Sequence, residues 1–553
     1  MDRPQDDKNQ LQGNISSLQQ PQDQTSQGVN YTPHSFYEQT SPVKSQQAPA
    51  TSSVEPLKAE SIGEDVVEEE SQQVQTPEQI PSPTPSLSPN PFRPPSTQIP
   101  PAVPPSDAQL PPPPPDDRGF SGFPFATIGK ILGVLLILGL VFFLLWKFAL
   151  PMFSKKQPEP VTLTYWGLWE EPRVMQAVFD DFTKQHPHIK INYTREDIKE
   201  YRERLTTRIP LGNGPDIFRY HNSWYPMLTT DLAPFPKGSL DTDVLQKQYF
   251  PVVQSDTVKN GAVYGIPLGI DTLALFVNDE IIQAAGQPIP TTWDEFITVA
   301  KATTVKDQTN KIVTAGAALG TYDNITHAPD ILALIMMQNG TDFSNLENTK
   351  GQAAEALRFY TSFAKDSGNV WDSNLEPSIN QFAAGNLTMY IGYSWDIFTL
   401  QAMNPSLKFS THPVPNLPGK SLSIASYWIE GVSSKSPHQK EAFMLLSYLQ
   451  QKSTLEKLYT ETAKTRAFGE LYPRADLADL LKSNALIYPF VQQAPVAVSS
   501  YFMSSTYDSG GINEQMNGYL GNAVRSVLQT TSPESAIDTL SSGVSQILDQ
   551  YGQ

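Results

Sequence analysis

The sequence predicts an α/β fold with two lobes. An N-terminal tail without a globular core and one apolar segment long enough to span a membrane precede it. Three observations support this prediction. Composition changes near residue 125, a charge-free stretch follows, and strand-like and helix-like patterns alternate from Val161 onwards. About 400 residues remain after the first two segments, which is enough for two lobes with sizeable cores.

The predicted tail comprises residues 1–125 and is rich in Pro, Gln and Ser. It holds 24 of the 49 prolines and has 16 acidic but 6 basic residues, a net charge of −10. Such a segment cannot bury enough apolar surface to offset its conformational entropy, so we expect it to be disordered. The run Pro111–Pro115 favours polyproline II, either as a stiff spacer or as a docking site for an aromatic-lined groove.

A transmembrane signal anchor is predicted over residues 126–153. Residues 131–146 carry no charge, and Lys130 and Lys147 flank them. Because flanking lysines can extend to the interface, the apolar stretch reaches about 20 residues, enough to cross a bilayer. A buried core helix is the alternative. The segment lies too far from the N-terminus for a cleaved signal peptide, and a short linker, 154–160, follows it.

The distribution of basic residues around this segment slightly favours an orientation with the C-terminal part in the cytoplasm. Arg118 and Lys130 precede the apolar stretch, whereas Lys147, Lys155 and Lys156 follow it. The positive-inside rule counts these basic residues and places the richer side in the cytoplasm. A globular part that works outside the cell needs the opposite orientation, which conflicts with this count of basic residues.

From Val161 the pattern predicts a strand, a helix and a second strand. Val161–Tyr165 and Ile189–Tyr193 alternate in polarity, and between them Glu170–Gln185 repeats apolar residues at helical spacing. This order indicates a parallel sheet covered by helices. Further helices are expected to start at a capping box, Thr292–Glu295, and to cover 353–364, 440–449 and 535–548.

Charge and motif content exclude several classes of function. The chain carries a net charge of −18 and has no cysteine. An acidic chain argues against a general nucleic-acid binder, and the lack of cysteine excludes disulfides, thiolate catalysis and cysteine-ligated zinc. Common hydrolase and nucleotide-binding motifs are missing, and the histidines have no zinc spacing. We therefore predict no catalytic residue, no metal and no cofactor. Adjacent carboxylates such as Glu170 and Glu171 are expected to be solvated charges.

Aromatic residues stand beside polar residues at the ends of several expected strands. In open parallel sheets, ligands bind outside the carboxyl ends of the strands. Aromatic faces pack against sugar rings, and Asp, Asn and Glu accept hydroxyl hydrogen bonds. Core packing better explains any single tryptophan, but the clusters together favour a shared binding site. They are 165–169, 220–225, 393–396 and 426–431.

Several segments, in this order, resemble the family 1 extracellular solute-binding proteins of ABC importers, the group that includes maltose-binding protein. The resemblance covers roughly 161–553. It is most specific over Val263–Pro267, Thr272–Asn278 and Pro290–Phe296, and the further matching segments are Gly214–Ile217, Phe382–Met389, Gly392–Trp395 and Ser434–Leu446. Members of this family usually begin with a cleaved signal peptide, whereas this chain has a long tail and an apolar span.

The resemblance implies a type II periplasmic-binding-protein-like fold over 161–553, with a hinge between two α/β lobes. Lobe 1 is expected to comprise about 161–270 and 411–461, and lobe 2 about 271–410 and 462–553. Ligand is expected in the cleft between them. Asp216 has a structural alternative as a helix cap or turn residue. The expected ligand-binding residues are Trp166, Trp169, Asp216, Tyr220, Asn222, Trp224, Asp271, Trp395, Trp428, Glu430 and Arg466.

The function that this resemblance implies is capture without chemistry. We expect a substrate-binding protein of an ABC importer that is anchored in the cell membrane and binds a mono- or oligosaccharide outside the cell. Its tail is then cytoplasmic, and its partners are the sugar, the permease subunits and the membrane, with no nucleic acid. Two alternatives use the same surface. One is a sensor or scaffold that reports ligand occupancy, and the other is a glycan-acting enzyme.

Overall fold

The computed structural model describes residues 125–149, 159–365 and 367–553. The predicted tail, apart from Phe125, and most of the predicted linker lie outside the described residues. The chain divides into two compact units, one containing the helix at 125–149 and the other containing the globular part. Each unit is described by itself.

Helix α1 (Phe125–Leu144) continues into one π-helical turn, η2 (Leu145–Ala149). Within it, Gly129–Lys147 is the one stretch among the described residues that is long and apolar enough to cross a membrane. Its large apolar side chains, from Ile131 to Trp146, are exposed rather than packed in a protein core. The apolar stretch Gly129–Lys147 falls within the predicted anchor, 126–153, and its length and composition are compatible with that prediction.

Lobe 1 of the globular part is built on a six-stranded sheet with the order β2-β1-β3-β14-β4, and β7 pairs with β14. Strands β1, β2 and β3 are parallel, as the sequence predicts, while β14 runs antiparallel to β3. The strands are β1 (Val161–Gly167), β2 (Ile189–Arg195), β3 (Ile217–His221), β4 (Leu232–Ala233), β7 (Ile266–Pro267) and β14 (Trp428–Ser433).

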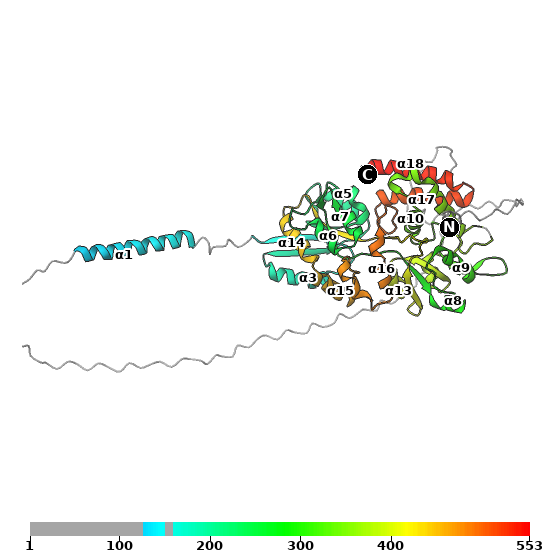
Figure 1. Ribbon diagram of the computed structural model, residues 1–553, viewed down its shortest axis with the longest axis horizontal. Helices are drawn as coiled ribbons and strands as arrows, with labels where there is room; N and C mark the ends of the chain where they lie inside the picture. Colours follow the sequence, from blue (N-terminus) through cyan, green and yellow to red (C-terminus); the bar gives the residue numbers. More distant parts are fainter. Residues whose placement is uncertain (1–124, 150–158, 366) are drawn as a thin grey trace, which may run out of the picture. The chain divides into compact units, whose positions relative to one another are not determined.

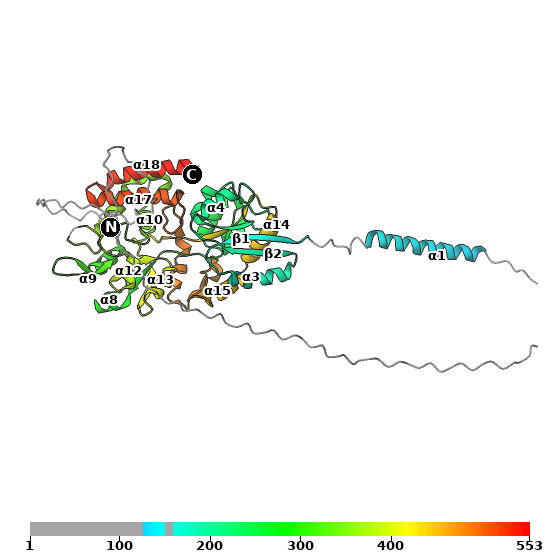
Figure 2. The ribbon, with the colours of Figure 1, turned by 180° about the vertical axis from the view of Figure 1, so that it is seen from behind.

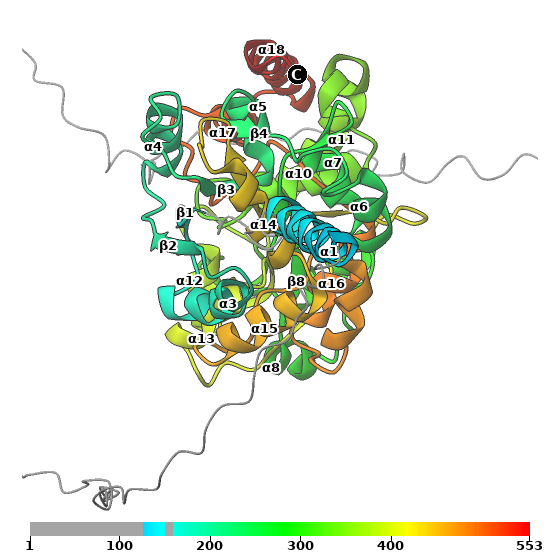
Figure 3. The same ribbon diagram turned by 90° about the vertical axis from the view of Figure 1, so that its left-hand side faces the viewer.

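Helices cover this sheet. In α3 the predicted apolar stripe, Met175 to Phe182, is buried, and Pro172 occupies the first turn. Helices α3 and α15 pack side by side although almost 270 residues separate them (Figures 1 and 3). The helices are α3 (Pro172–Gln185), α4 (Tyr201–Arg208), α5 (Tyr225–Leu228), α6 (Thr242–Gln248), α7 (Pro251–Thr257), α14 (Gln439–Leu449) and α15 (Lys452–Ala463), with the turn η3 (Asn222–Trp224) and the hairpin β5 (Val258–Lys259) and β6 (Ala262–Val263).

Lobe 2 is built on a five-stranded sheet with the order β12-β8-β11-β10-β9. Its strand β12 pairs antiparallel with β8, and the expected lobe boundary at 410–411 falls inside β12. The sheet therefore keeps this whole strand in lobe 2. The strands are β8 (Ala274–Asn278), β9 (Val305–Lys306), β10 (Ile312–Ala317), β11 (Leu387–Gly392) and β12 (Phe409–Pro413).

The predicted capping box starts a helix in lobe 2. The Thr292 hydroxyl accepts a hydrogen bond from the Glu295 backbone N–H, and the Glu295 carboxylate accepts one from the Thr292 backbone N–H. The other predicted helices are also present, and α17 and α18 pack together (Figures 1 and 2). The helices are α8 (Asp279–Ala284), α9 (Trp293–Thr303), α10 (Ala328–Gln338), α11 (Lys350–Ser362), α12 (Ser378–Ala383), α13 (Asp396–Met403), α16 (Tyr488–Gln492), α17 (Ile512–Gln529) and α18 (Pro533–Tyr551), with the turns η4 (Phe343–Thr349), η5 (Ala475–Leu481) and η6 (Ala494–Val496).

Three chain segments run side by side where the lobes join. β13 (Ser423–Ile424) pairs in parallel with β15 (Ala497–Val498), and Thr272 forms an antiparallel bridge with Ala425. Backbone hydrogen bonds from Leu273 to Ile424 and from Ser426 to Asp271 extend this contact. Crossing segments of this kind can act as a hinge, because a few backbone angles at each crossing can change together.

Candidate ligand-binding site

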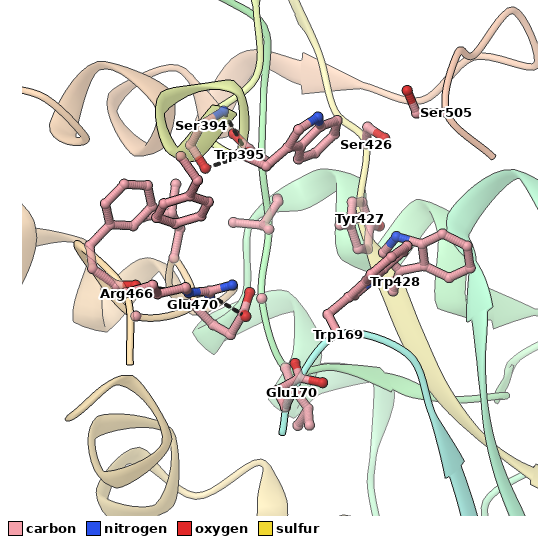
Figure 4. Close-up of a pocket in the computed structure, with 18 of the residues that line it drawn as sticks. Trp169, Glu170, Ser394, Trp395, Ser426, Tyr427, Trp428, Arg466, Glu470 and Ser505 are labelled. Carbon is pink, nitrogen blue, oxygen red and sulfur yellow. Dashed lines mark hydrogen bonds and ion pairs between the residues drawn. The ribbon is translucent and has the colours of Figure 1, made fainter. Parts of the chain in front are cut away.

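A cavity of about 490 Å³ lies between the lobes, and both lobes contribute to its lining (Figure 4). Its size is that of a small-molecule site. The lining residues are Trp169, Glu170, Arg219, His221, Leu268, Gly269, Ile270, Asp271, Ser394, Trp395, Phe398, Thr399, Ser426, Tyr427, Trp428, Arg466, Phe468, Gly469, Glu470, Leu471, Ser505 and Tyr507.

The lobe 1 wall of this cavity carries two tryptophans. Trp169 follows β1, and Trp428 opens β14 opposite His221, the last residue of β3. Their rings meet edge-to-face with centroids 5.6 Å apart, and Trp428 in turn packs edge-to-face on Trp224 at 5.2 Å. Trp169 is 42% exposed. Both tryptophans stand at the sheet edge where β1 and β3 end, which is where open parallel sheets bind ligands.

The lobe 2 wall carries Trp395, which follows β11 and precedes α13. Its ring stacks on Tyr393 with centroids 4.3 Å apart and an interplanar angle of 17°. The Asp271 carboxylate fixes the same turn, because it accepts hydrogen bonds from Ser394 N at 2.9 Å and Ser394 Oγ at 2.5 Å. Burial raises the pKa of Asp271 well above its usual value. Figure 4 shows Trp395 facing the cavity from the side opposite Trp169 and Trp428.

A buried ion triad forms part of the lobe 1 wall, and two of its members, Glu170 and Arg219, line the cavity. Arg219 Nη1 lies 2.6 Å from a Glu170 oxygen and Arg219 Nε lies 2.6 Å from a Glu430 oxygen, and each side chain is at most 3% exposed. Burial acts to lower the pKa of Arg219, but the two carboxylates raise it above its usual value, so the group stays cationic. The triad joins β3 and β14 to the loop after β1.

His221 lies beside this triad and is uncharged at neutral pH. Burial lowers its pKa to about 3. Its ring nitrogens lie 2.7 Å from Ser223 Oγ and 3.1 Å from Ser426 Oγ. Hydroxyls can donate or accept, so the neutral ring is fully hydrogen-bonded.

Arg466 and Glu470 form an ion pair at the cavity rim. The Arg466 guanidinium also lies over the Phe398 ring, 4.9 Å from its centroid, and its Nε donates to the Phe468 carbonyl at 3.0 Å. Both groups are partly exposed, so they can also reach a polar ligand at the rim. Among the residues that the structure describes, no group of three or more His, Asp or Glu is arranged to hold a metal ion.

The structure brings five of the expected site residues to the cavity. They are Trp169, Asp271, Trp395, Trp428 and Arg466. The other expected residues lie elsewhere and do not line it. They are Trp166, Asp216, Tyr220, Asn222, Trp224 and Glu430.

Asp216 is a structural residue in this position. Its carboxylate accepts hydrogen bonds from Thr164 N and Thr164 Oγ1, both at 2.8 Å, and from Ser436 Oγ at 2.6 Å. It therefore ties β1 to the loop after β14, which matches the turn-residue alternative for Asp216.

The remaining expected residues are packed behind the cavity. Tyr220 and Trp224 are fully buried, and Glu430 belongs to the ion triad. Asn222 donates to Ser499 Oγ at 2.8 Å and thereby links lobe 1 to the chain after β15. Trp166 is half-buried, and Arg208 lies 5.5 Å from its ring centroid. These polar and aromatic residues support the walls instead of forming them.

Sequence reasoning missed several lining residues. Ser426 and Tyr427 lie in a cluster that the sequence did single out. Arg219, Ser505 and Tyr507 stand in no motif, and nothing in the local sequence distinguishes them from other residues. Long-range pairing alone brings them to the cavity.

The fold has counterparts in known proteins. Residues 177–479, more than half of the chain, match the family described as bacterial extracellular solute-binding proteins. The chain belongs to this family. It is therefore a solute-binding protein and not an enzyme.

Individual relatives have low sequence identity to this chain, but each match covers more than half of it. The chain is 22% identical to the multiple sugar-binding protein of Streptococcus mutans over 349 residues, which is 60% of this chain and 80% of that protein. It is 21% identical to the maltodextrin-binding protein MdxE of Bacillus subtilis over 339 residues, which is 58% of this chain and 76% of that protein.

Solved structures establish the fold. A cyclo/maltodextrin-binding protein complexed with maltotetraose matches with a TM-score of 0.58 and 19% identity, covering 71% of this chain and 99% of that chain. The sugar-binding protein MalE of Xanthomonas citri matches with a TM-score of 0.56 and 21% identity, covering 70% of this chain and 98% of that chain. The predicted two-lobed, maltose-binding-protein-like fold is thus confirmed.

Proposed function

We propose that this protein captures a mono- or oligosaccharide in the cavity between its lobes and delivers it to an ABC importer from the outer face of the cell membrane. The observation that carries the proposal is the pair of tryptophan-bearing walls, with Trp395 on one side and Trp169 and Trp428 on the other. Aromatic faces pack against the apolar faces of sugar rings. The names of the relatives given above, which mention sugar and maltodextrin, support the same ligand class.

Capture follows from closure of the lobes. A sugar held between the two walls contacts both lobes at once, which it does fully in the closed state. The sugar then stabilises that state by its higher affinity for it, while the three crossing segments act as the hinge. Hydroxyl groups of the sugar find hydrogen-bonding partners in Ser426, Arg466 and Glu470, which line the cavity.

Attachment to the membrane through α1 is part of the proposal. The apolar stretch Gly129–Lys147 supports it by length and composition. The basic residues around the helix slightly favour an inward-facing globular part. Membership in an extracellular family supports the opposite, outward-facing orientation. Protease added to intact cells should therefore degrade the globular part. Its complete protection would contradict the proposed orientation.

The ligand class is tested by thermal unfolding of the full-length chain with a panel of neutral sugars that includes maltotetraose and mannobiose. A sugar at about 100 times its dissociation constant should stabilise the protein by about 2.7 kcal/mol. Chromatography of the same mixtures should recover the sugar unchanged. If no sugar raises the melting temperature, the proposed ligand class is wrong.

The site is tested by replacing Trp395 with Ala. Calorimetry should show at least about tenfold weaker binding of the sugar that binds best, because the stacking surface of the lobe 2 wall is removed. Trp166→Ala is the matched control, since this tryptophan lies outside the cavity. Unchanged affinity in Trp395→Ala would remove Trp395 from the site.

A further inference from the structure

Behind the lobe 2 wall lies a buried polar cluster, which we call the lobe 2 cluster. It consists of His327, Asp330, Asp396 and Ser504. His327, Asp330 and Asp396 are at most 3% exposed, and none of the four lines the cavity. Burying charged groups is unfavourable unless they are paired and hydrogen-bonded, so the arrangement of this cluster calls for an explanation.

The first contact of the cluster is with the turn that carries Trp395. His327 Nε2 lies 2.9 Å from Asp396 Oδ2, and the same oxygen accepts a hydrogen bond from Tyr393 N at 3.1 Å. The His327 ring also packs edge-on against Tyr393 at 5.1 Å and against Trp395 at 6.2 Å. His327 therefore contacts both rings of the stacked pair and the carboxylate that closes their turn.

The second contact is with the segment 504–507, which follows the third crossing. His327 Nδ1 lies 2.7 Å from Ser504 Oγ, and Asp330 accepts from Ser504 N at 2.8 Å. Ser505 and Tyr507 line the cavity, and both have left-handed backbones with φ of 60° and 53°. Such conformations persist in non-glycine residues when the surroundings hold them. Ser504 is the point at which the cluster holds this segment.

Asp330 closes the arrangement, because its other oxygen accepts from Tyr393 OH at 2.8 Å. The cluster thus joins two cavity-lining elements that are more than 100 residues apart in the sequence.

We infer that His327 is a positioning residue for the binding site, which fixes Trp395 and the segment 504–507 relative to one another from inside lobe 2 and does so in its protonated form. The inference rests on the proposed function for its effect on sugar affinity, while its effect on the two segments stands on the geometry of the cluster.

The two charge states of the His327 ring differ in the hydrogen bonds that they allow. In the imidazolium both ring nitrogens donate, one to Asp396 and one to Ser504 Oγ, so the Ser504 hydroxyl proton remains free for its side-chain bond to Asp330. In the neutral ring that donates to Asp396, Nδ1 accepts the Ser504 hydroxyl proton instead, and Asp330 loses that bond. Deprotonation therefore loosens the link between the two segments.

The groups that face His327 are Asp396, Asp330, Asp271, Tyr390 and Tyr393. Burial acts to lower the pKa of His327, but the three carboxylates raise it above its ordinary value of 6.5. Because the folded-state pKa is the higher one, the stabilisation is complete below the unfolded value and is lost as pH rises through the folded value.

Hydrogen exchange of the full-length chain tests the inference without any ligand. After correction for intrinsic rates, protection of peptides covering 393–399 and 502–509 should fall about tenfold when the pH is raised from about 6 to a value above the folded-state pKa of His327. His327→Gln keeps a donor and an acceptor without the charge. It should show the low protection at both pH values.

His412→Gln is the matched control. His412 is a half-buried histidine of lobe 2 that bonds Ser410 and does not contact the cluster, so this variant should keep the wild-type profile. Equal protection of the wild-type peptides at both pH values would overturn the inference. So would a His327→Gln profile identical to that of the wild type. Should His327→Gln not fold, the wild-type profile decides alone.

Calorimetry with maltotetraose measures whether the charge of His327 also affects sugar affinity. Binding should be about tenfold weaker at the higher pH, which is about 1.4 kcal/mol, and His327→Gln should bind with the weak affinity throughout. If neither maltotetraose nor any other panel sugar binds, the proposed function fails, while the exchange experiment still tests the role of His327. Wild-type affinity that is independent of pH would count against the coupling of His327 to the site.

Discussion

The two walls of the cavity each carry tryptophan, but a different buried cation supports each wall. In lobe 1 the cation is Arg219, placed between two buried glutamates. In lobe 2 it is His327, placed among aspartates. An arginine keeps its charge at every physiological pH, whereas a histidine can lose it. The cation of the lobe 1 wall therefore keeps its charge as the pH changes, whereas the cation of the lobe 2 wall can lose it.

Each lobe has one buried histidine at its wall: His221 lines the cavity in lobe 1, and His327 lies behind the wall of lobe 2. His221 has two hydroxyl partners, and burial lowers its pKa to about 3. His327 is equally buried but has Asp396 at one nitrogen, and its pKa is raised. The pKa of the same side chain is thus shifted in opposite directions because its neighbours differ and not because its exposure differs.

The largest expected effect is a loss of stability when the cation of the lobe 1 wall is removed. Arg219→Met leaves Glu170 and Glu430 buried without a cation, and we expect it to lower the free energy of unfolding by about 3–5 kcal/mol. Urea denaturation measures this. Arg195→Met is the control, because Arg195 pairs with Glu171 at the surface, where ion pairs contribute little. Similar losses in both variants would mean that the triad has no special role.

A smaller effect is expected for Asp216, which stabilises the fold but does not line the cavity. Asp216→Ala removes the acceptor of three part-buried hydrogen bonds, and it should lower the free energy of unfolding by about 1–3 kcal/mol. Sugar affinity measured by calorimetry should stay unchanged, because Asp216 does not line the cavity. A marked loss of affinity in a folded variant would return Asp216 to the site.

The third effect sharpens the contrast between the two histidines. The folded-state pKa of His221 lies below its unfolded value, so the unfolded chain binds the proton more tightly and stability falls as pH drops below 6.5. The slope is at most about 1.4 kcal/mol per pH unit. In denaturation series at several pH values, His221→Gln should lose this acid-side slope. An unchanged slope would assign it to other groups.

The smallest effect compares the walls by ligand affinity. Trp169 is 42% exposed and meets Trp428 edge-on, whereas Trp395 is stacked flat on Tyr393. Trp169→Ala should weaken sugar binding by about threefold, less than Trp395→Ala, because a more exposed and less fixed ring contributes less contact. Calorimetry of both variants with one sugar tests the order. A reversed order would make lobe 1 the main stacking surface.

The local patterns of the fold could be predicted from the sequence. The apolar stripe of α3 is buried and the capping box at Thr292 is formed, since both depend on residues within a few positions of each other. The antiparallel insertion of β14 between β3 and β4 could not be predicted in this way. Its partners lie about 200 residues earlier, and period-two alternation does not specify a partner strand.

The candidate site was predictable in part for the same reason. Trp169 and Trp395 follow strands whose ends face the cavity, and strand-end position is visible in sequence. Trp224 also follows a strand, but the short turn after β3 directs it into the core. Tyr507 reaches the cavity from a loop near the C-terminal helices, and its sequence neighbours give no sign of this.

The sequence by itself determined the separation of tail, apolar span and α/β part, the type of most elements and the family, because these follow from composition, periodicity and ordered short motifs. The tertiary structure decided which aromatic and charged side chains face the cavity and which support it. It also decided that Arg219 is held between two glutamates and that His327 meets Asp396 while His221 meets serines. Burial and charge neighbours set these states, and both arise from contacts between residues far apart in the chain.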